Sequence, residues 1–464
     1  MNLNLNNLKS LTTEEIMASS FGIEWEGLRT TSNGHLSLTP HPKRFGDKLK
    51  NPIVTTDFSE SQLEIITEAY DSVDEAFDMF SIISDLININ LKKDEYIWFQ
   101  SIPCILPKAD KIPIAKYSIE GINSEIYRKE LAKKYGFKKQ MISGVHFNFS
   151  FKESSIEKLY ELFGKNMTYK EFKDEIYLKL SRNYLRYCWL IIYLTGCSVG
   201  CHETFTKDCI KLTDCEDGYG GHYTTKGPSL RNSSIGYKNL IKLYPSYKNV
   251  LSFTDDLKSY LKKGVLIQAK ELYAQIRLKP KDPQNMITSL INDGIQYVEI
   301  RTLDINPFYK CGLIKHDMKF LHIFLIYMLI KDESEYENWQ EEAILNEENT
   351  AEKAYDSSMR LIKDGSEIIL KDWALELINE MYIMCEELGI EKEKTLDLMY
   401  NRIKNPSLTY GQRLIKLVEK NGFINTHVEL SKNNKKASKT FVETTDLSEI
   451  KEIKKMYYKC ATCN

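Results

Sequence analysis

The sequence predicts an α+β fold in which helices pack against an antiparallel sheet with one apolar and one polar face. Several stretches alternate between apolar and polar side chains, most regularly over 141–151. Apolar residues recur at helical spacing over 72–91, and the last third of the chain is polar, lysine-rich and typical of helices. Without an internal repeat or a Pro/Ser linker, we expect one domain over 1–464, sheet-based over 1–325 and mostly helical over 326–464.

The composition is that of a globular protein able to bury a large core. Of 464 residues, 42% are hydrophobic and 11% aromatic, which excludes a disordered chain. Lys and Arg number 63 against 65 Asp and Glu, and this net charge of −2 offers no basic surface to a nucleic acid.

Localisation is predicted to be cytoplasmic. The N-terminal region has no apolar segment of signal-peptide length, and the longest apolar run, 188–194, is too short to cross a membrane. The ten cysteines follow no disulfide framework, so we expect reduced thiols. Cys460 and Cys463 form a CxxC that we interpret as a floppy tail, because no second Cys/His pair lies at zinc spacing.

The first predicted strand carries two acidic side chains on one face. Glu24 and Glu26 point away from Ile23 and Trp25. Ser-Asn-Gly at 32–34 predicts a hairpin turn and a return strand at 36–38. In the next strand region, 55–67, Asp57 precedes the strand, and the residues sharing its polar face are Gln62 and Glu64.

Helices are expected at 72–91 and at 125–135, the second ended by Gly136. The strand at 141–151 then presents His146 and Asn148 on its polar face. Helical sequence follows over 154–195. The Gly-, Cys- and Thr-rich region 196–228 is expected to be a long loop, of the kind that often forms lids or binding loops, and further helices are predicted at 319–330 and 373–388.

Two more strands with polar faces complete the predicted sheet. The strand at 271–280 has Tyr273, Gln275 and Arg277 on one face. The strand within 292–308 has Tyr297, Glu299 and Arg301 on one face and Val298, Ile300 and Thr302 on the other.

Five predicted strands thus carry acids, His or Arg on the face away from the core, which indicates one acidic concave surface. Clustered carboxylates stay ionised only where cations compensate them, and oxygen ligands with at most one imidazole suit Mg²⁺ or Mn²⁺. Arginines beside such metals favour phosphoryl transfer. Because no P-loop or GxGxxG motif is present, the residues predict an ATP- and Mg-dependent phosphoryl-transfer or ligase site of another type, or alternatively a metal-stabilised binding protein.

An ordered set of motifs resembles bacterial glutamate–cysteine ligase (γ-glutamylcysteine synthetase) of the proteobacterial type. The motifs run in family order from about residue 20 to 325, and they are GIEWEGLR, TPHP, TTDFSESQLEIIT, SIPC, KQMISGVHFNFS, SLRNSSIGY, ELYAQIR and GIQYVEIRTLDINPF. The resemblance implies a glutamine-synthetase-like antiparallel sheet bent into a funnel and surrounded by helices. It also implies that ATP phosphorylates the side chain of L-glutamate and that the amine of L-cysteine attacks the γ-glutamyl phosphate.

The resemblance further implies roles for individual residues. The implied metal ligands are Glu24, Glu26, Asp57, Glu64, His146 and Glu299. The implied catalytic group at the transferring phosphoryl is Arg301, with Glu299 and Arg277. The implied cysteine pocket consists of Tyr127, Leu131, Gln140, Arg231, Tyr237 and Tyr273.

Plainer interpretations stand beside these roles. Tyr127 and Leu131 lie one helical turn apart and are compatible with a simple core contact. His146 alone is typical of a satisfied core histidine, and Arg231 is compatible with a surface charge.

The sequence also departs from the family pattern. Trp25 stands where a basic residue is common, and because it faces away from the glutamates we expect altered packing rather than altered chemistry. The region 196–228 is divergent, so a different amine acceptor remains an alternative, as does a non-catalytic nucleotide- or amino-acid-binding regulator. Its cysteines, expected as thiols or alternatively as a redox-sensitive disulfide, are Cys197, Cys201, Cys209 and Cys215. We expect a separate glutathione synthetase to act downstream, and a monomer is the simplest expectation.

Overall fold

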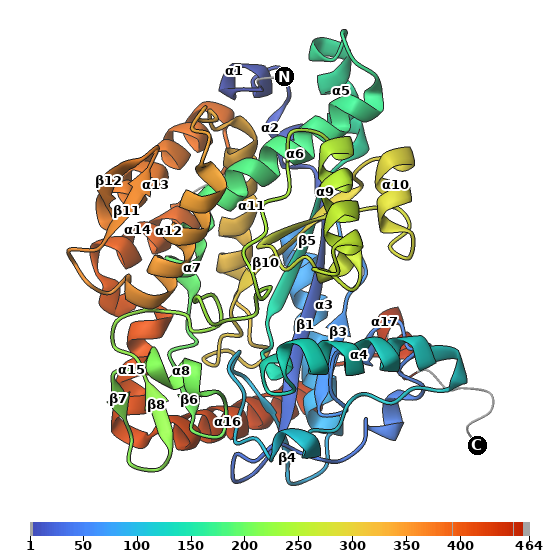
Figure 1. Cartoon of the computed structure of the whole chain (residues 1–464), viewed down its shortest axis with the longest axis vertical. Helices are drawn as coiled ribbons and strands as arrows, with labels where there is room; N and C mark the ends of the chain where they lie inside the picture. The colour runs from blue at the N-terminus through green and yellow to red at the C-terminus, as the bar shows by residue number, and fades with distance from the viewer. Residues whose placement is uncertain (1–2, 392, 449, 458–464) are drawn as a thin grey trace.

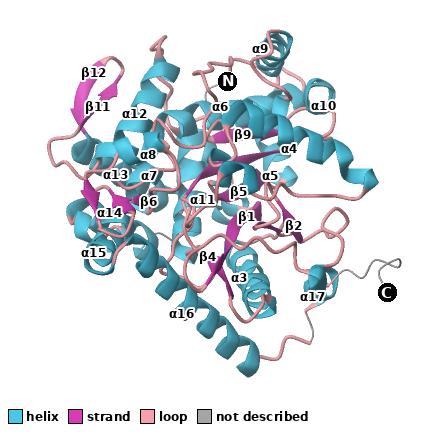
Figure 2. Ribbon diagram, turned by 60° about the horizontal axis from the view of Figure 1, so that its bottom comes forward, coloured by secondary structure: helices cyan, strands magenta, loops and turns pink. Residues whose placement is uncertain are grey.

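The computed structural model describes residues 3–391, 393–448 and 450–457. At its centre lies an antiparallel sheet with the strand order β2-β3-β1-β5-β10-β9, and β4 also pairs with β1. Figure 2 shows these strands in the middle of the molecule with helices around them. The strands are β1 (Ser19–Thr31), β2 (Val54–Thr56), β3 (Gln62–Ile66), β4 (Glu95–Trp98), β5 (Val145–Phe151), β9 (Ile276–Lys279) and β10 (Tyr297–Leu303).

One face of the sheet forms the hydrophobic core with three long helices, α3 (Val73–Asn90), α6 (Tyr169–Tyr187) and α11 (Lys315–Ile330). Trp25 is fully buried, and its ring centroid lies 6.5 Å from that of Phe80 on α3. Phe21 packs edge-on against His322 of α11 at 4.8 Å. Since side chains alternate along a strand, burying these residues forces Glu24 and Glu26 onto the opposite face.

Local sequence signals explain where the helices begin and end. The Thr168 hydroxyl accepts a hydrogen bond from the Glu171 amide, and Glu171 accepts one from the Thr168 amide, so a capping box starts α6. Gly136 ends α4, as predicted, with a φ of +87° that other residues rarely adopt. The other helices before α11 are α1 (Leu5–Leu8), α2 (Thr13–Met17), α4 (Ile122–Tyr135), α5 (Glu153–Phe163), α7 (Trp189–Thr195), α8 (Lys207–Lys211), α9 (Val250–Lys262) and α10 (Met286–Asp293).

The C-terminal part is mostly helical, as predicted, and packs beside the sheet (Figure 1). Helix α12 contacts α6 and α7, and α14 contacts α11. Helix α16 runs along the bottom of Figure 1 and packs on α3 and β4. The helices are α12 (Trp339–Lys353), α13 (Leu370–Leu388), α14 (Glu393–Lys404), α15 (Tyr410–Asn421), α16 (Phe423–Thr444) and α17 (Lys451–Met456).

Several predicted elements differ from the structure. The prediction of a long loop over 196–228 is wrong. This region contains α8 and a small sheet of β6 (Gly200–His202), β7 (Cys215–Glu216) and β8 (Gly221–Tyr223). The return strand at 36–38 is reduced to a bridge between Thr30 and Leu36. Within 271–280, only Ile276–Lys279 is a strand. The helical C-terminal part also contains a hairpin of β11 (Arg360–Lys363) and β12 (Ser366–Ile369).

The predicted α+β class with a central antiparallel sheet is confirmed. None of the helices in the described ranges combines the length and apolar character needed to cross a lipid bilayer. No disulfide joins the eight cysteines of those ranges, and the Cys209 thiol contacts the Cys201 thiol. The predicted tail cysteines, Cys460 and Cys463, lie outside the described residues.

Candidate active site

The polar side chains of five strands meet on one face of the sheet. Residues directly opposite each other on antiparallel strands project from the same face. The opposite pairs here are Glu26–Glu64, Glu24–His146, Glu299–Asn148 and Glu299–Arg277. The register therefore brings together acids, imidazole and guanidinium groups that lie up to 275 residues apart, from Glu24 to Glu299.

A bulge in β10 sets the position of Arg301. Ile300 pairs with Phe147, but Leu303 pairs with Val145, so β10 contains one more residue than β5 between these pairs. Such a bulge bends the strand and re-aims its side chains. The Arg301 guanidinium contacts the Glu299 carboxylate, and its Nη1 lies 3.4 Å from His146 Nδ1.

Glu24, His146 and Glu299 form the set of ligand atoms with metal-like spacing. One ligand atom of each lies within 4.8 Å of the others, and among the described residues no other set of His, Cys, Asp or Glu has this arrangement. His146 Nδ1 lies 3.5 Å from Glu24 Oε2 and 3.9 Å from Glu299 Oε1, and Asn148 donates to Glu24 Oε1 at 3.0 Å. Burial and the nearby Arg301 lower the pKa of His146 to about 4, so its imidazole is neutral and able to coordinate a cation.

Three cations surround the fully buried Glu299 carboxylate. Arg277 Nη1 lies 3.2 Å away, and Lys279 and Arg301 also contact it. Burial alone raises the pKa of a carboxyl group, but these cations hold the pKa of Glu299 well below its usual range. The Glu299 carboxylate is therefore ionised and held next to three positively charged side chains, which we call the cationic cluster.

The other three predicted metal ligands form an acidic group beside this cluster. Burial, Asp57 and Glu24 raise the pKa of Glu64 to about 8, and burial with Asp57 and Glu64 raises that of Glu26 well above its usual value. The Asp57 pKa is also raised, chiefly by burial. Carboxyl groups this close to one another need a cation nearby to ionise together at neutral pH.

The predicted acceptor pocket is assembled from helix α4 and three separate segments. Tyr127 and Leu131 of α4 are buried and form a small apolar cluster with Tyr273 packed against it. The Tyr237 hydroxyl lies 3.4 Å from Gln140 Oε1 and 3.3 Å from the Tyr273 hydroxyl, and the two rings are 4.5 Å apart. Gln140 is 2% exposed, and its amide nitrogen has no hydrogen-bond partner within the described ranges.

Arg231 is buried and not a surface charge. Its Nη2 donates to the Arg301 carbonyl oxygen at 2.7 Å. A Cβ on Gly144 would lie 2.2 Å from the same guanidinium nitrogen, so the strand can approach Arg231 this closely only with glycine at 144. The backbone just before β5 therefore leaves the space that the Arg231 guanidinium occupies.

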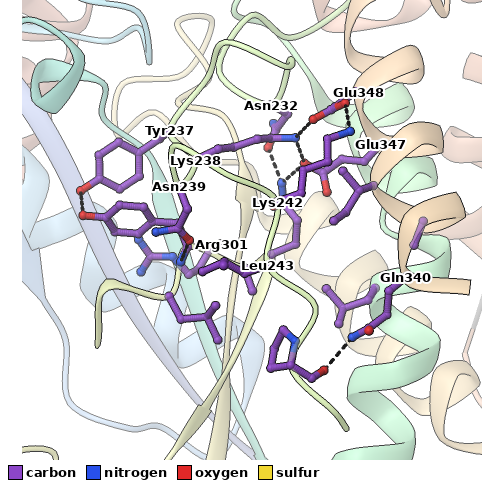
Figure 3. Close-up of a pocket in the computed structure, with 18 of the residues that line it drawn as sticks. Asn232, Tyr237, Lys238, Asn239, Lys242, Leu243, Arg301, Gln340, Glu347 and Glu348 are labelled. Atoms are coloured by element: carbon purple, nitrogen blue, oxygen red, sulfur yellow. Dashed lines mark hydrogen bonds and ion pairs between the residues drawn. The ribbon is translucent and has the colours of Figure 1, made fainter. Parts of the chain in front are cut away.

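A cavity of about 230 Å³ extends from Arg231, Tyr237 and Arg301 towards α12 (Figure 3). Tyr237 and Arg301 lie at one side of this cavity, and Glu347 and Glu348 of α12 lie at the other. The predicted acceptor residues Tyr127, Leu131 and Gln140 do not line it.

Comparison with known proteins identifies the family. The family model described as glutamate-cysteine ligase matches residues 5–265 and 240–352. This chain belongs to the glutamate–cysteine ligase family. A protein named glutamate–cysteine ligase from Clostridium acetobutylicum is 34% identical over 85% of this chain and 91% of its own length.

Other members of the family are longer. A glutathione biosynthesis bifunctional protein from Clostridium perfringens is 39% identical over 93% of this chain, and one from Listeria monocytogenes is 34% identical over the same share. The chain spans about half the length of these bifunctional relatives, 56% and 55% respectively.

Solved structures of the family share the fold. A glutamate–cysteine ligase from Francisella tularensis in complex with AMP has a TM-score of 0.85 at 28% identity and covers 95% of this chain and 92% of its own. A bifunctional glutathione synthetase from Pasteurella multocida has a TM-score of 0.81 at 28% identity and covers 93% of this chain and 54% of its own.

Two basic residues at this site are not among the site residues predicted from the sequence. Lys279, which contacts Glu299, lies on the same face of β9 as Arg277 and was detectable from that alternation. Arg128 of α4 donates to the backbone oxygens of Asp57 and Thr56, and no sequence signal links α4 to that turn.

Proposed function

We propose that this chain ligates the γ-carboxylate of L-glutamate to the amine of L-cysteine, with ATP consumed and γ-glutamylcysteine, ADP and phosphate formed. Family membership supports this reaction. The observation that carries the proposal is the convergence of Glu24, His146 and Glu299 with Arg277 and Arg301 on one sheet face. Metal ligands beside arginines are the arrangement that phosphoryl transfer requires.

The donor set fits Mg²⁺ or Mn²⁺. Glu24, His146 and Glu299 supply carboxylate oxygens and one imidazole at metal-like spacing, and Glu26, Asp57 and Glu64 add a second acidic group that lacks sufficient cations of its own. When bound there, such cations would neutralise phosphate charge and the charge of these carboxylates.

The cationic cluster of Arg277, Lys279 and Arg301 suits the phosphates of ATP. Arg301 lies against Glu299 and beside His146, where its planar guanidinium can donate two hydrogen bonds to a transferring phosphoryl group. Arg277 and Lys279 lie on the neighbouring strand and would assist. Glu299 fixes all three cations before substrate arrives, so little reorganisation is needed during transfer.

The acceptor pocket fits a small amino acid with a thiol. Arg231 has the planar geometry that matches an α-carboxylate. Tyr237 and Tyr273 have ring centroids 4.5 Å apart, Tyr273 packs against the cluster that contains Tyr127, and these rings would contact the side chain of the acceptor. The unpartnered Gln140 amide supplies one further donor. The amine would then attack the γ-glutamyl phosphate held at Arg301.

We also propose that 1–325 and 326–464 act as one domain. The same hydrophobic core contains Ile23 of β1, Phe324 of α11 and Met381 of α13. That a separate glutathione synthetase consumes the γ-glutamylcysteine stays a prediction, because the relatives include both bifunctional and shorter proteins.

The test is ADP release by the purified protein. We expect turnover only when ATP, Mg²⁺ or Mn²⁺, glutamate and cysteine are all present, and the product should have the mass of glutamate plus cysteine less water. Chelation of the metal should abolish turnover, and added Mg²⁺ should restore it. Turnover with another amine and not with cysteine would assign a different acceptor, and ATP binding without turnover would favour a regulatory protein.

Two variants test the site itself. Glu299→Gln and Arg301→Met should each lower kcat by about 100-fold or more while the circular dichroism spectrum is retained. Glu367→Gln, which changes an exposed carboxylate on the β11–β12 hairpin, is the matched control and should keep normal turnover. Near-normal turnover in both site variants would show that the chemistry occurs elsewhere.

A further inference from the structure

The segment 231–242 joins the acceptor pocket to the C-terminal helical part. It begins at Arg231 and carries Tyr237, and its residues 238–242 line the cavity next to α12 (Figure 3). Its position therefore fixes two of the six residues expected to bind the acceptor.

Apolar packing holds the first part of this segment, where Ile235 and Tyr237 pack against a buried apolar cluster, but holds its end only weakly. Leu240 and Ile241 are 60% and 57% exposed, so they bury little of their surface against the protein. The cavity of about 230 Å³ lies between the segment and α12, and it leaves room for the segment to shift. Polar contacts must therefore supply most of the positional restraint on 238–242.

Three glutamates of α12 supply several of those contacts, and Asn239 adds hydrogen bonds with the Glu271 carbonyl oxygen and the Tyr273 amide. Lys238 Nζ lies 2.8 Å from Glu347 Oε1 and 3.3 Å from Glu348 Oε1, and Lys242 Nζ lies 2.9 Å from Glu348 Oε2. Glu352 Oε1 accepts from the amide and the hydroxyl of Ser234, at 2.8 and 2.6 Å. Glu348 and Glu352 are four residues apart, so they lie on one face of the helix.

Glu347 also reaches the sheet beside Arg301. Its Oε1 accepts from Gln275 at 2.6 Å, and the same Gln275 amide lies 3.1 Å from Asn232 Oδ1. Asn232 in turn donates to the Thr302 carbonyl oxygen on β10 at 3.0 Å. One carboxylate thus connects α12, the acceptor segment and the strand that carries the phosphoryl-binding arginine.

The Lys238 contacts are the most shielded of these ion pairs. The Lys238 side chain is 19% exposed, and Glu347 and Glu348 are 7% and 12% exposed, whereas Lys242 is 49% exposed. Burial lowers a lysine pKa, but the two glutamates hold the pKa of Lys238 above its usual value, so it is fully charged. Shielded ion pairs are costly to break, because the remaining partner is left charged and unpaired.

We propose that Glu347 and Glu348 are positioning residues for the amine acceptor, because they hold Lys238 and thereby keep Arg231 and Tyr237 in the acceptor pocket. The proposal rests on the function proposed above. It assigns to α12, outside the sheet-based part, a share in the affinity for cysteine and no share in phosphoryl transfer.

Lys238→Met tests the proposal by steady-state kinetics. We expect the KM for cysteine to rise about tenfold or more, while the KM values for ATP and glutamate and the kcat at saturating cysteine change by no more than about twofold. Lys238→Arg keeps the charge and should restore most of the affinity. Lys353→Met is the control, since Lys353 is an exposed lysine of the same helix that donates to Asn349.

A double-mutant cycle separates positioning from general destabilisation. Glu347→Gln combined with Lys238→Met should cost less than the sum of the single changes, because both remove one interaction. Equal rises of all three KM values with a lower melting temperature, or no change in the KM for cysteine, would overturn the proposal.

A second measurement does not depend on the reaction. Amide hydrogen exchange in 231–242 should be faster in Lys238→Met than in wild type and in Lys353→Met. If wild type shows no turnover with cysteine, the proposed function fails, and the exchange result still decides whether α12 holds this segment. Unchanged exchange would show that it does not.

Discussion

Gly144 decides whether Arg231 can reach the site. The Arg231 guanidinium occupies the space into which a side chain at 144 would project, with only 2.2 Å between its Nη2 and an added Cβ. The guanidinium is buried, so a displaced arginine would lose its bond to the Arg301 carbonyl.

Gly144→Ala is therefore expected to raise the KM for the acceptor by about tenfold or more, because a small misplacement of a binding group is costly. Steady-state kinetics with cysteine as the varied substrate is the measurement. Gly22→Ala is the control, since its Cβ would meet Asn148 at an ordinary 3.5 Å. Equal affinity for cysteine in both variants would show that Arg231 does not bind it.

The residue-level prediction from sequence succeeded where alternation decides the face. Glu24, Glu26 and Glu299 face away from the core because Ile23, Trp25 and Ile300 are buried beside them. Contacts between segments far apart in the chain could not be predicted from the sequence. Nothing in the sequence near Lys238 predicts that Glu347, 109 residues later, is its partner.

At the scale of elements, Asp174 links α6 to the start of β10. Its Oδ1 accepts from the Ile295 amide at 2.7 Å, at a turn where Gly294 has a φ of +74°. Glu299 and Arg301 follow within a few residues, so this contact helps set where the strand begins.

Asp174→Ala should lower the free energy of unfolding by about 1–3 kcal/mol, because it leaves a buried amide without its acceptor. Urea unfolding followed by circular dichroism measures this. Lys170→Ala removes the half-exposed partner of the same carboxylate and should cost less than about 1 kcal/mol. If both variants lose the same stability, the ion pair and not the turn contact is what matters.

Elements with a clear period were predictable, and short ones were not. Residues 141–151 and 72–91 have regular patterns, and they contain the expected strand and helix, although β5 begins only at Val145. The strands of 196–228 contain two or three residues each, too few for any period to be visible. The β10 bulge is likewise a matter of pairing with β5, which one strand's sequence does not reveal.

At the scale of the whole molecule, buried neutral histidines make stability depend on pH. Burial lowers the pKa of His427 and His322 to about 3, and burial with Lys48 lowers that of His41 to about 4. In the unfolded chain these groups take up protons below about pH 6.5. The unfolded state therefore binds more protons, and stability is present above pH 6.5 and is lost as pH falls towards 4.

His427→Gln should flatten this dependence by up to about 1.4 kcal/mol per pH unit relative to wild type. The measurement is urea unfolding between pH 7.5 and about 5, compared between the two proteins. His35→Gln, a change of an exposed histidine in the turn after β1, is the control for replacing a histidine by glutamine. An unchanged slope in His427→Gln would mean that His427 is already protonated in the folded state.

The order of strands in the sheet also affects how the chain folds during its synthesis. β1 pairs with β5 and β5 with β10, so the central pairings join segments more than a hundred residues apart. Folding with such high contact order is slow, because long loops must close before the pairings form. On the ribosome, the glutamates of β1 emerge long before Glu299, and β10 then inserts between β5 and β9. Until residue 303 has emerged, the nascent chain carries an open β5 edge that must be kept from pairing with other chains.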